Sequence, residues 1–219
     1  MKKLYAIPGL GVDERLFKNI LIPGFELIPV KWITPLKGER LEDYAGRLAQ
    51  QIDKHEPFYL IGVSFGGMCA VEIAKKYFPL RTIIISSAKG PADLPWYFKV
   101  FRFIPIHRLV SDNTAIRLAL RFRGMFGVKD GEQKKLFDEM LRTAPANYYA
   151  RAINCIVHWR NKEVPGDLSH LHGTCDRIIP LRFVKNPTTI KNGSHFMVLN
   201  SADEINASLE KILTLSVRP

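Results

Sequence analysis

Short apolar runs alternate with helical patterns along most of the chain. The runs have the length of buried strands, and several are rich in β-branched residues. These runs are 3–7, 26–32, 58–63, 81–87, 168–172 and 187–191. Apolar residues recur at helical spacing in 41–54, 67–77 and 202–213. Strands that alternate with helices are typical of a mostly parallel sheet with helices on both faces. The pattern therefore predicts an α/β fold, and Pro29 indicates that the second strand lies at a sheet edge.

Residues 89–162 break this alternation, because no strand pattern occurs there. The segment begins with a proline-rich stretch, and three apolar stripes at helical spacing follow. The stripes are Ile116, Leu120 and Met125; Leu136, Phe137, Met140 and Leu141; and Tyr149, Ile153, Ile156 and Val157. Ser111 or Asp112 has a side chain suited to the N-cap of the first predicted helix. We therefore predict a core of residues 1–88 and 163–219, with 89–162 inserted as a helical cap.

The chain has 219 residues, of which 47% are apolar and 24% are charged. These values are typical of one globular domain and exclude a collagen, a coiled coil and a disordered tail. No apolar run approaches the roughly 18–20 residues of a membrane span, so we expect no transmembrane helix. The two lysines near the N-terminus precede only a short apolar stretch without a cleavage site. We therefore predict a cytoplasmic protein.

The three cysteines, Cys69, Cys155 and Cys175, lie far apart and form no CxxC pair. We predict reduced, mostly buried thiols rather than a zinc site or a disulfide framework. His170 and His172 would share one face of a strand, but no third ligand accompanies them, so we expect no metal. The early glycines are too few for a dinucleotide fingerprint. The sequence therefore predicts no cofactor.

The segment Gly62-Val63-Ser64-Phe65-Gly66 matches the pattern G-x-S-x-G. A predicted strand precedes it and a predicted helix follows it, which is the setting of a nucleophile elbow. In such a turn, residues without side chains let the backbone fold tightly and lift the serine off the sheet. The positive end of the following helix points at the reaction centre. Ser64 is therefore a candidate nucleophile, and it needs a base to remove its proton.

A base and an orienting carboxylate follow later in the chain. His195 lies in a loop between the last predicted strand and the last predicted helix, and it is a candidate general base. Asp176 follows a predicted strand, and a carboxylate there would hold the histidine in the required tautomer. Asp93 and Asp167 are alternatives for this role. The order Ser64, Asp176, His195 is the Ser…Asp…His order of one fold class.

These motifs together resemble the α/β-hydrolase superfamily over nearly the whole chain, as a minimal version of that fold. The resemblance implies a catalytic triad of Ser64, Asp176 and His195. The segment 89–162 matches only as a cap. Relatives of this kind include esterases, thioesterases, lactonases, C–C bond hydrolases and lyases that abstract protons. The motif residues do not separate these activities, because specificity lies in the cap.

The resemblance also implies an oxyanion hole of two backbone N–H groups, from Leu10 and Phe65. Many relatives have His-Gly at the point where this chain has Pro8 and Gly9. The hole needs only a backbone donor, and Leu10 keeps one. We therefore expect this departure to be compatible with activity.

Lysine and arginine exceed aspartate and glutamate by 11, and 8 of these charges fall within 89–162. The same segment holds 11 of the 23 aromatic residues. The candidate substrate-binding residues are Trp96, Phe98, Phe101, Arg121 and Arg123. The aromatic side chains would form an apolar pocket, or else pack the cap on the sheet. The arginines would steer an anionic substrate, or else form a solvated face.

The sequence favours a serine hydrolase that cleaves a carboxylic ester or thioester of a small or acyl-chain substrate through an acyl-enzyme. The same triad also suits C–C bond hydrolysis or lyase chemistry. Two other classes are a basic module that binds nucleic acid or an acidic membrane, and a hydrolase fold that serves as a ligand receptor. No nucleic-acid-binding motif accompanies the charge. We therefore expect a small-molecule ester or thioester as the partner and no nucleic acid, and the oligomeric state stays open.

Overall fold

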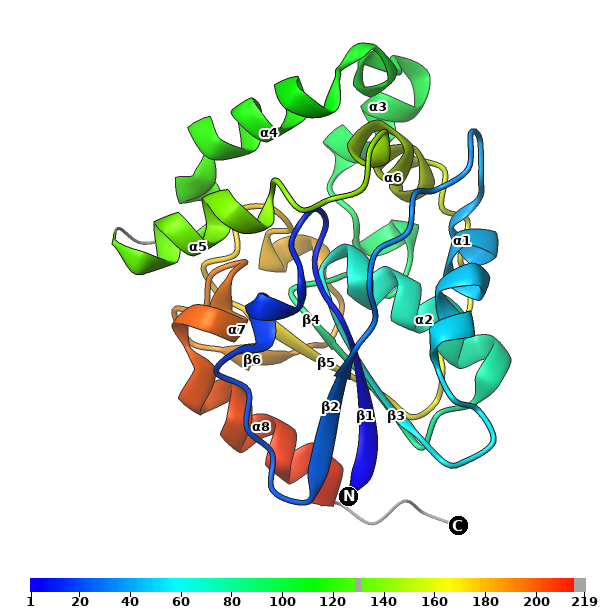
Figure 1. The fold of residues 1–219 in the computed structure, drawn as a ribbon, viewed down its shortest axis with the longest axis vertical. Coiled ribbons are helices and arrows are strands. Elements are labelled where there is room, and N and C mark those ends of the chain that lie inside the picture. Colours follow the sequence, from blue (N-terminus) through cyan, green and yellow to red (C-terminus); the bar gives the residue numbers. More distant parts are fainter. Residues whose placement is uncertain (129–130, 215–219) are drawn as a thin grey trace.

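The computed structural model describes residues 1–128 and 131–214. A six-stranded sheet lies at its centre in the order β2-β1-β3-β4-β5-β6, and every neighbouring pair is parallel (Figure 1). The strands are β1 (Lys2–Ile7), β2 (Phe25–Pro29), β3 (Tyr59–Val63), β4 (Arg81–Ile85), β5 (Leu168–Gly173) and β6 (Thr188–Ile190). The predicted α/β fold is confirmed, and the strand that contains Pro29 lies at the sheet edge as predicted.

Helices cover both faces of the sheet (Figure 1). On one face lie α1 (Leu41–Leu48) and α2 (Phe65–Tyr77), and on the other lie α7 (Met197–Asn200) and α8 (Ala202–Thr214). All five residues of β3 are buried, which explains its continuous apolar sequence. In the described part of the chain, no helix combines the length and the apolar character that crossing a membrane requires.

Between β4 and β5 the described residues form helices and no strand. These helices are α3 (Trp96–Phe103), α4 (Asp112–Arg121), α5 (Glu132–Met140) and α6 (Tyr148–Val157). We call residues 89–162 the insert. Figure 1 shows its helices above the carboxyl ends of the strands. The division into a core and an inserted cap stays a prediction, and its residues 129–130 and 215–219 lie outside the described part of the chain.

The N-cap of α4 is Ser111, whose hydroxyl oxygen accepts a hydrogen bond from the Thr114 N–H at 3.3 Å. The other candidate, Asp112, is the first residue of that helix. Met125, predicted in the same helix, lies beyond α4 in a 3₁₀ turn. The pattern also did not predict α3 as a helix, although it singled out the aromatic residues there.

Two boundaries in the core differ from the pattern for local reasons. The run 81–87 is a strand only to Ile85, because Ser86 has a φ of 48° and leaves the extended conformation. The predicted helix 41–54 is α-helical only to Leu48 and continues as a short 3₁₀ turn. The backbone conformation of one residue, Ser86, therefore ends the strand earlier than the side-chain pattern indicates.

The three cysteines are free thiols, and Cys69 and Cys155 are buried as predicted. Cys175 is the exception and is exposed, because it lies in the turn after β5. Burial raises the pKa of Cys155 to about 12, so this thiol stays protonated at neutral pH. The two buried cysteines therefore act as small apolar side chains in the core.

Candidate active site

Ser64 stands on a sharp turn between β3 and α2. Its φ of 53° and ψ of −118° form a conformation that residues other than glycine rarely adopt. A Cβ at Gly62 would lie 2.4 Å from the Gly66 carbonyl oxygen, and a Cβ at Gly66 would lie 2.2 Å from the Pro8 carbonyl oxygen. Both distances are far below a normal contact. Close backbone packing therefore explains the glycines of the G-x-S-x-G pattern.

Hydrogen bonds to its carbonyl oxygen hold Ser64 in this turn. The oxygen accepts the N–H groups of Gly67 at 2.9 Å and Met68 at 3.2 Å. The Ser87 hydroxyl donates to the same oxygen at 2.6 Å, from the segment that follows β4. Ser87 was not singled out in the sequence, although its place at the end of the predicted strand 81–87 was an available signal. It positions Ser64 from the segment that follows the neighbouring strand.

His195 links Ser64 to Asp176. Its Nε2 lies 2.9 Å from Ser64 Oγ, and its Nδ1 lies 2.8 Å from Asp176 Oδ2. The other carboxylate oxygen accepts the N–H groups of Ile178 at 2.8 Å and Ile179 at 2.9 Å. The carboxylate is therefore held at both oxygens. The structure brings together the three residues that the sequence singled out, from segments that follow β3, β5 and β6.

The two alternative acids lie elsewhere. Asp93 is buried, but its carboxylate accepts the N–H groups of Lys89 at 3.0 Å and Lys185 at 3.4 Å. Asp167 immediately precedes β5. Its carbonyl oxygen accepts the N–H group of Thr82 in β4, so it lies at the amino ends of the strands. Neither carboxylate is the partner of His195, whose Nδ1 faces Asp176.

The protonation states suit a general base. Burial alone would raise the pKa of Asp176, but the charge and hydrogen bond of His195, together with the Ile179 N–H, lower this pKa below its usual value. The carboxylate is therefore ionised at neutral pH and accepts the Nδ1 proton of His195. The Nε2 lone pair is then directed at Ser64 Oγ. This arrangement is able to remove the serine proton.

Two further buried histidines lie next to Asp176. His172 Nε2 donates to the Ile179 carbonyl oxygen at 2.8 Å and lies 3.6 Å from Asp176 Oδ2. Its Nδ1 is 3.2 Å from His170 Nε2, so His170 is the donor of that hydrogen bond. Three of the four ring nitrogens therefore bond within the protein. The described residues contain no group of three or more acidic, histidine or cysteine side chains placed to hold a metal ion.

We expect the free energy of unfolding to fall as the pH drops below about 6.5, the usual pKa of histidine. Burial lowers the pKa of His170 to about 3 and also lowers the pKa of His172. Between these values the unfolded chain binds more protons than the folded chain. The contribution of the neutral histidines to the free energy of unfolding is therefore fully present well above pH 6.5 and decreases as the pH falls. At pH 5, His170 alone lowers the free energy of unfolding by about 2 kcal/mol. Urea denaturation at several pH values measures this dependence.

The matched variants for this prediction are His170→Leu and His55→Gln, because His170 is buried and His55 is exposed. The absolute stability of His170→Leu is not the readout. The readout is the change in unfolding free energy between pH 7 and pH 5. This change should shrink in His170→Leu and persist in His55→Gln. An equal pH dependence in His170→Leu and the wild type would contradict the prediction.

The two predicted oxyanion donors lie on segments next to the nucleophile. Phe65 is the first residue of α2, where an N–H group has no partner within the helix. Leu10 lies in the loop after β1 and lines the same cavity as Ser64. Their backbone N–H groups are the donors that we assign to an oxyanion in the proposal below.

Trp32 holds the loop that contains Leu10. Its indole N–H donates to the carbonyl oxygens of Gly9 at 3.1 Å and Val12 at 2.9 Å. Its ring also stacks on Phe65, with centroids 5.2 Å apart. Trp32 therefore contacts both segments of the predicted oxyanion hole. The sequence pattern placed it only in a strand, and its position at the carboxyl end of that run was the available signal.

A cavity of about 440 Å³ adjoins Ser64 and His195. The core and the insert both contribute to its lining, and the side chains are mostly aliphatic or aromatic, such as Phe122, Phe137 and Ile153. No aspartate, glutamate, lysine or arginine occurs among its described lining residues. This lining fits an apolar group and offers no charge to an anion.

The predicted substrate-binding residues divide into two groups. Phe98 and Phe101, three residues apart on α3, line the cavity. Trp96 lies outside the lining and is 64% exposed. Arg121 and Arg123 also lie outside it; Arg121 stacks over the neighbouring phenyl ring and Arg123 donates to a backbone carbonyl of α4. Two of the five predicted substrate-binding residues therefore line the cavity.

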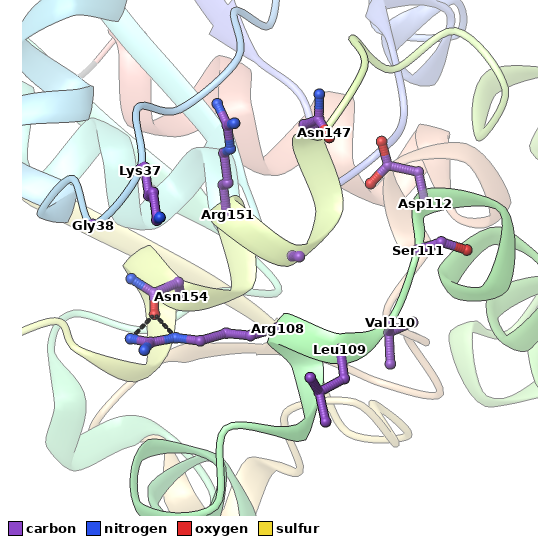
Figure 2. A pocket seen from close by; sticks show the side chains of 11 residues that line it. Lys37, Gly38, Arg108, Leu109, Val110, Ser111, Asp112, Asn147, Arg151 and Asn154 are labelled. Atoms are coloured by element: carbon purple, nitrogen blue, oxygen red, sulfur yellow. Dashed lines mark hydrogen bonds between the residues drawn. The ribbon is translucent and has the colours of Figure 1, made fainter.

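A second pocket, of about 670 Å³, lies where the loop around Lys37 meets the insert (Figure 2). Its lining is mixed and includes the charged side chains of Arg108 and Arg151. Part of the positive charge of the insert therefore gathers at this pocket rather than inside the cavity at Ser64.

Comparison with known proteins gives the family. The family model described as the alpha/beta hydrolase family matches residues 8–208. The chain therefore belongs to the α/β-hydrolase family, and the resemblance found in the sequence is confirmed. No curated protein matches the chain.

Solved structures of this fold superpose over nearly the whole chain. An esterase from Exiguobacterium antarcticum is 15% identical, covers 98% of this chain and 92% of its own, and has a TM-score of 0.73. A bromoperoxidase from Bacillus anthracis is 16% identical, covers 97% and 91%, and has a TM-score of 0.73. An enol-lactonase from Burkholderia xenovorans is 13% identical, covers 97% and 91%, and has a TM-score of 0.70. At these identities the likeness shows the fold alone.

Proposed function

We propose that this protein is a serine hydrolase that cleaves a carboxylic ester or thioester through an acyl-enzyme. The observation that carries the proposal is the continuous contact from Ser64 Oγ through His195 to Asp176, at 2.9 Å and 2.8 Å. The esterases among the structural neighbours support the reaction class by analogy.

In the proposed reaction, Ser64 Oγ attacks the carbonyl carbon while His195 Nε2 takes the hydroxyl proton. The N–H groups of Leu10 and Phe65 stabilise the negative charge on the carbonyl oxygen. The bond to the leaving oxygen or sulfur then breaks, and His195 returns its proton to the leaving alcohol or thiol. Water next attacks the acyl-enzyme with His195 as base, releases the acid and restores Ser64. Asp176 stabilises the imidazolium in both steps.

The cavity supports an apolar acyl group on the substrate. Its described lining carries no ionised carboxylate, ammonium or guanidinium group, so the acyl chain meets mostly carbon atoms. Each buried methylene contributes about 0.8 kcal/mol, or about a fourfold gain in kcat/KM. We therefore expect kcat/KM to rise with chain length until the cavity is filled.

The test combines covalent labelling with turnover. We expect a fluorophosphonate to label the wild type at Ser64, located by peptide mass spectrometry, and butanoyl and octanoyl esters to react faster than acetyl esters. Ser64→Ala should lose both the fluorophosphonate labelling and the ester hydrolysis. Ser194→Ala is the control, because its hydroxyl is close to the site but accepts a hydrogen bond from Asn200. A folded wild type that is neither labelled nor active on any ester would contradict the proposal and favour lyase chemistry or a receptor.

A further inference from the structure

Three cations from three separate elements surround the pocket shown in Figure 2, which we call the basic pocket. Lys37 comes from the loop between β2 and α1, Arg108 from the 3₁₀ turn at Ile106–Leu109, and Arg151 from α6. The volume of the basic pocket is about 670 Å³. A space of this size accommodates more than a single carboxylate.

The positive charges of the basic pocket are not cancelled within the described structure. The Arg108 guanidinium donates to Asn154 Oδ1 at 2.8 Å and 3.1 Å, and Arg151 donates to the Pro35 carbonyl oxygen at 3.1 Å. Both acceptors are neutral, so they orient the guanidinium groups and leave their charge in place. None of the three cations forms an ion pair with a described residue.

The one acidic residue in the described lining has another role. The carboxylate oxygens of Asp112 accept the N–H groups of Tyr148 and Tyr149, each at 3.2 Å, at the start of α6. The lining therefore carries three positive charges and one negative charge, so its net charge stays positive. Guanidinium groups present a planar set of donors that matches phosphate oxygens. This chemistry fits a phosphate-bearing anion.

The basic pocket and the catalytic cavity share a wall. Val110 lines both spaces, so they come within one side chain of each other. Helix α6 separates them along its length: Ile153 and Ile156 line the cavity, whereas Arg151 and Asn154 line the basic pocket. One molecule with an apolar end and an anionic end is therefore complementary to the two spaces together.

We propose that the basic pocket binds the phosphorylated leaving half of the substrate, which is then an acyl thioester or ester of a phosphate-bearing thiol or alcohol. This inference rests on the proposed function, because the acyl half is assigned to the cavity beside Ser64. Lys37 and Arg108 bind phosphate oxygens, and the released thiol or alcohol carries the phosphate away. The charge that recognises the anion is thus in the basic pocket and not at Arg121 and Arg123.

Binding to the Ser64→Ala protein tests the inference without turnover. Calorimetry compares octanoyl-coenzyme A with the octanoyl thioester of N-acetylcysteamine, which has the same acyl group and no phosphate. We expect the phosphorylated thioester to bind at least about tenfold more tightly, with an affinity that falls as salt rises. In the Ser64→Ala protein, a further Lys37→Gln or Arg108→Gln substitution should lower the affinity for octanoyl-coenzyme A by about tenfold and leave the affinity for the other thioester unchanged. Arg121→Gln, a cation of the same insert outside both spaces, should leave both affinities unchanged.

Each outcome decides the inference. Equal affinity for the two thioesters overturns it, and so does an equal loss in Arg121→Gln and Lys37→Gln, which indicates a general field of the surface. Binding of inorganic pyrophosphate without a preference for octanoyl-coenzyme A also overturns it, because the site then takes a free anion. Turnover by the wild type is measured separately. If the wild type hydrolyses neither thioester and no ester of the chain-length series, the proposed function fails, whereas the difference in affinity still reports on the basic pocket.

Discussion

Asp176→Asn is expected to lower kcat by about 10³–10⁴ and to leave KM within a few-fold of the wild-type value. The amide oxygen of the variant still accepts the N–H groups of Ile178 and Ile179, which bond to the carboxylate at 2.8 Å and 2.9 Å. The amide nitrogen then faces His195 Nδ1, where the carboxylate oxygen lies at 2.8 Å. Two donors cannot share that contact, so the imidazole changes tautomer and no longer accepts the Ser64 proton.

Steady-state kinetics on the best ester of the chain-length series measures this effect. Asp93→Asn is the matched control, because Asp93 is also buried and also accepts backbone N–H groups, but from Lys89 and Lys185. It should cost stability and leave kcat close to the wild-type value once the protein is folded. If Asp93→Asn reduced kcat as strongly as Asp176→Asn, the role assigned to Asp176 would be wrong.

Gly66→Ala is expected to lower activity by at least about 10²-fold and to destabilise the fold by about 3 kcal/mol or more. The new Cβ would lie 2.2 Å from the Pro8 carbonyl oxygen and 2.3 Å from the Ile7 carbonyl oxygen. Both atoms belong to the backbone at the end of β1, so no side-chain rotation relieves the contact. The turn at Ser64 or the loop that contains Leu10 has to move, and either movement separates the nucleophile from the oxyanion donors.

Gly46→Ala provides the control for the loss of a glycine. Gly46 lies within α1, and a Cβ there meets no atom within 4 Å. Alanine should therefore leave activity unchanged and stabilise the protein by about 0.5–1 kcal/mol, because alanine loses less backbone freedom in a helix. Urea denaturation and ester turnover of the two variants separate packing at the elbow from the general effect of the substitution. Wild-type activity and stability in Gly66→Ala would refute the packing explanation.

The proposed substrate has an apolar end and an anionic end, and the proposal assigns each end to a different space in the structure. The cavity beside Ser64 has no ionised group in its described lining, whereas Lys37, Arg108 and Arg151 lie at the basic pocket. Burying an unpaired anion in an apolar cavity is costly, so a separate site for the anion lets one enzyme hold both ends. In the proposal, the cavity therefore determines the preference for the acyl chain, and the basic pocket recognises the leaving group.

Local sequence was sufficient to predict the sheet, most helices and the three candidate residues that the structure brings together. Strand and helix follow from hydrophobic periodicity, which is a property of neighbouring residues. Ser64 was recognisable as a candidate nucleophile because an elbow needs glycines at fixed distances from the serine. Asp176 and His195 were recognisable because they follow predicted strands, and the carboxyl ends of parallel strands meet at one edge of the sheet. These features depend on short segments and on side-chain type alone.

Tertiary structure decided which distant groups support the site and where the charge lies. Trp32 and Ser87 hold the predicted oxyanion loop and the turn at Ser64 through hydrogen bonds between segments that no local pattern relates. The direction of each side chain on the helices of the insert places Phe98 in the cavity and leaves Arg121 outside it. The sequence gives the number of charged residues in a segment, but only the packing of the chain determines where their side chains lie. The sequence therefore predicted a basic insert, and the structure separates an apolar cavity beside Ser64 from an adjoining basic pocket.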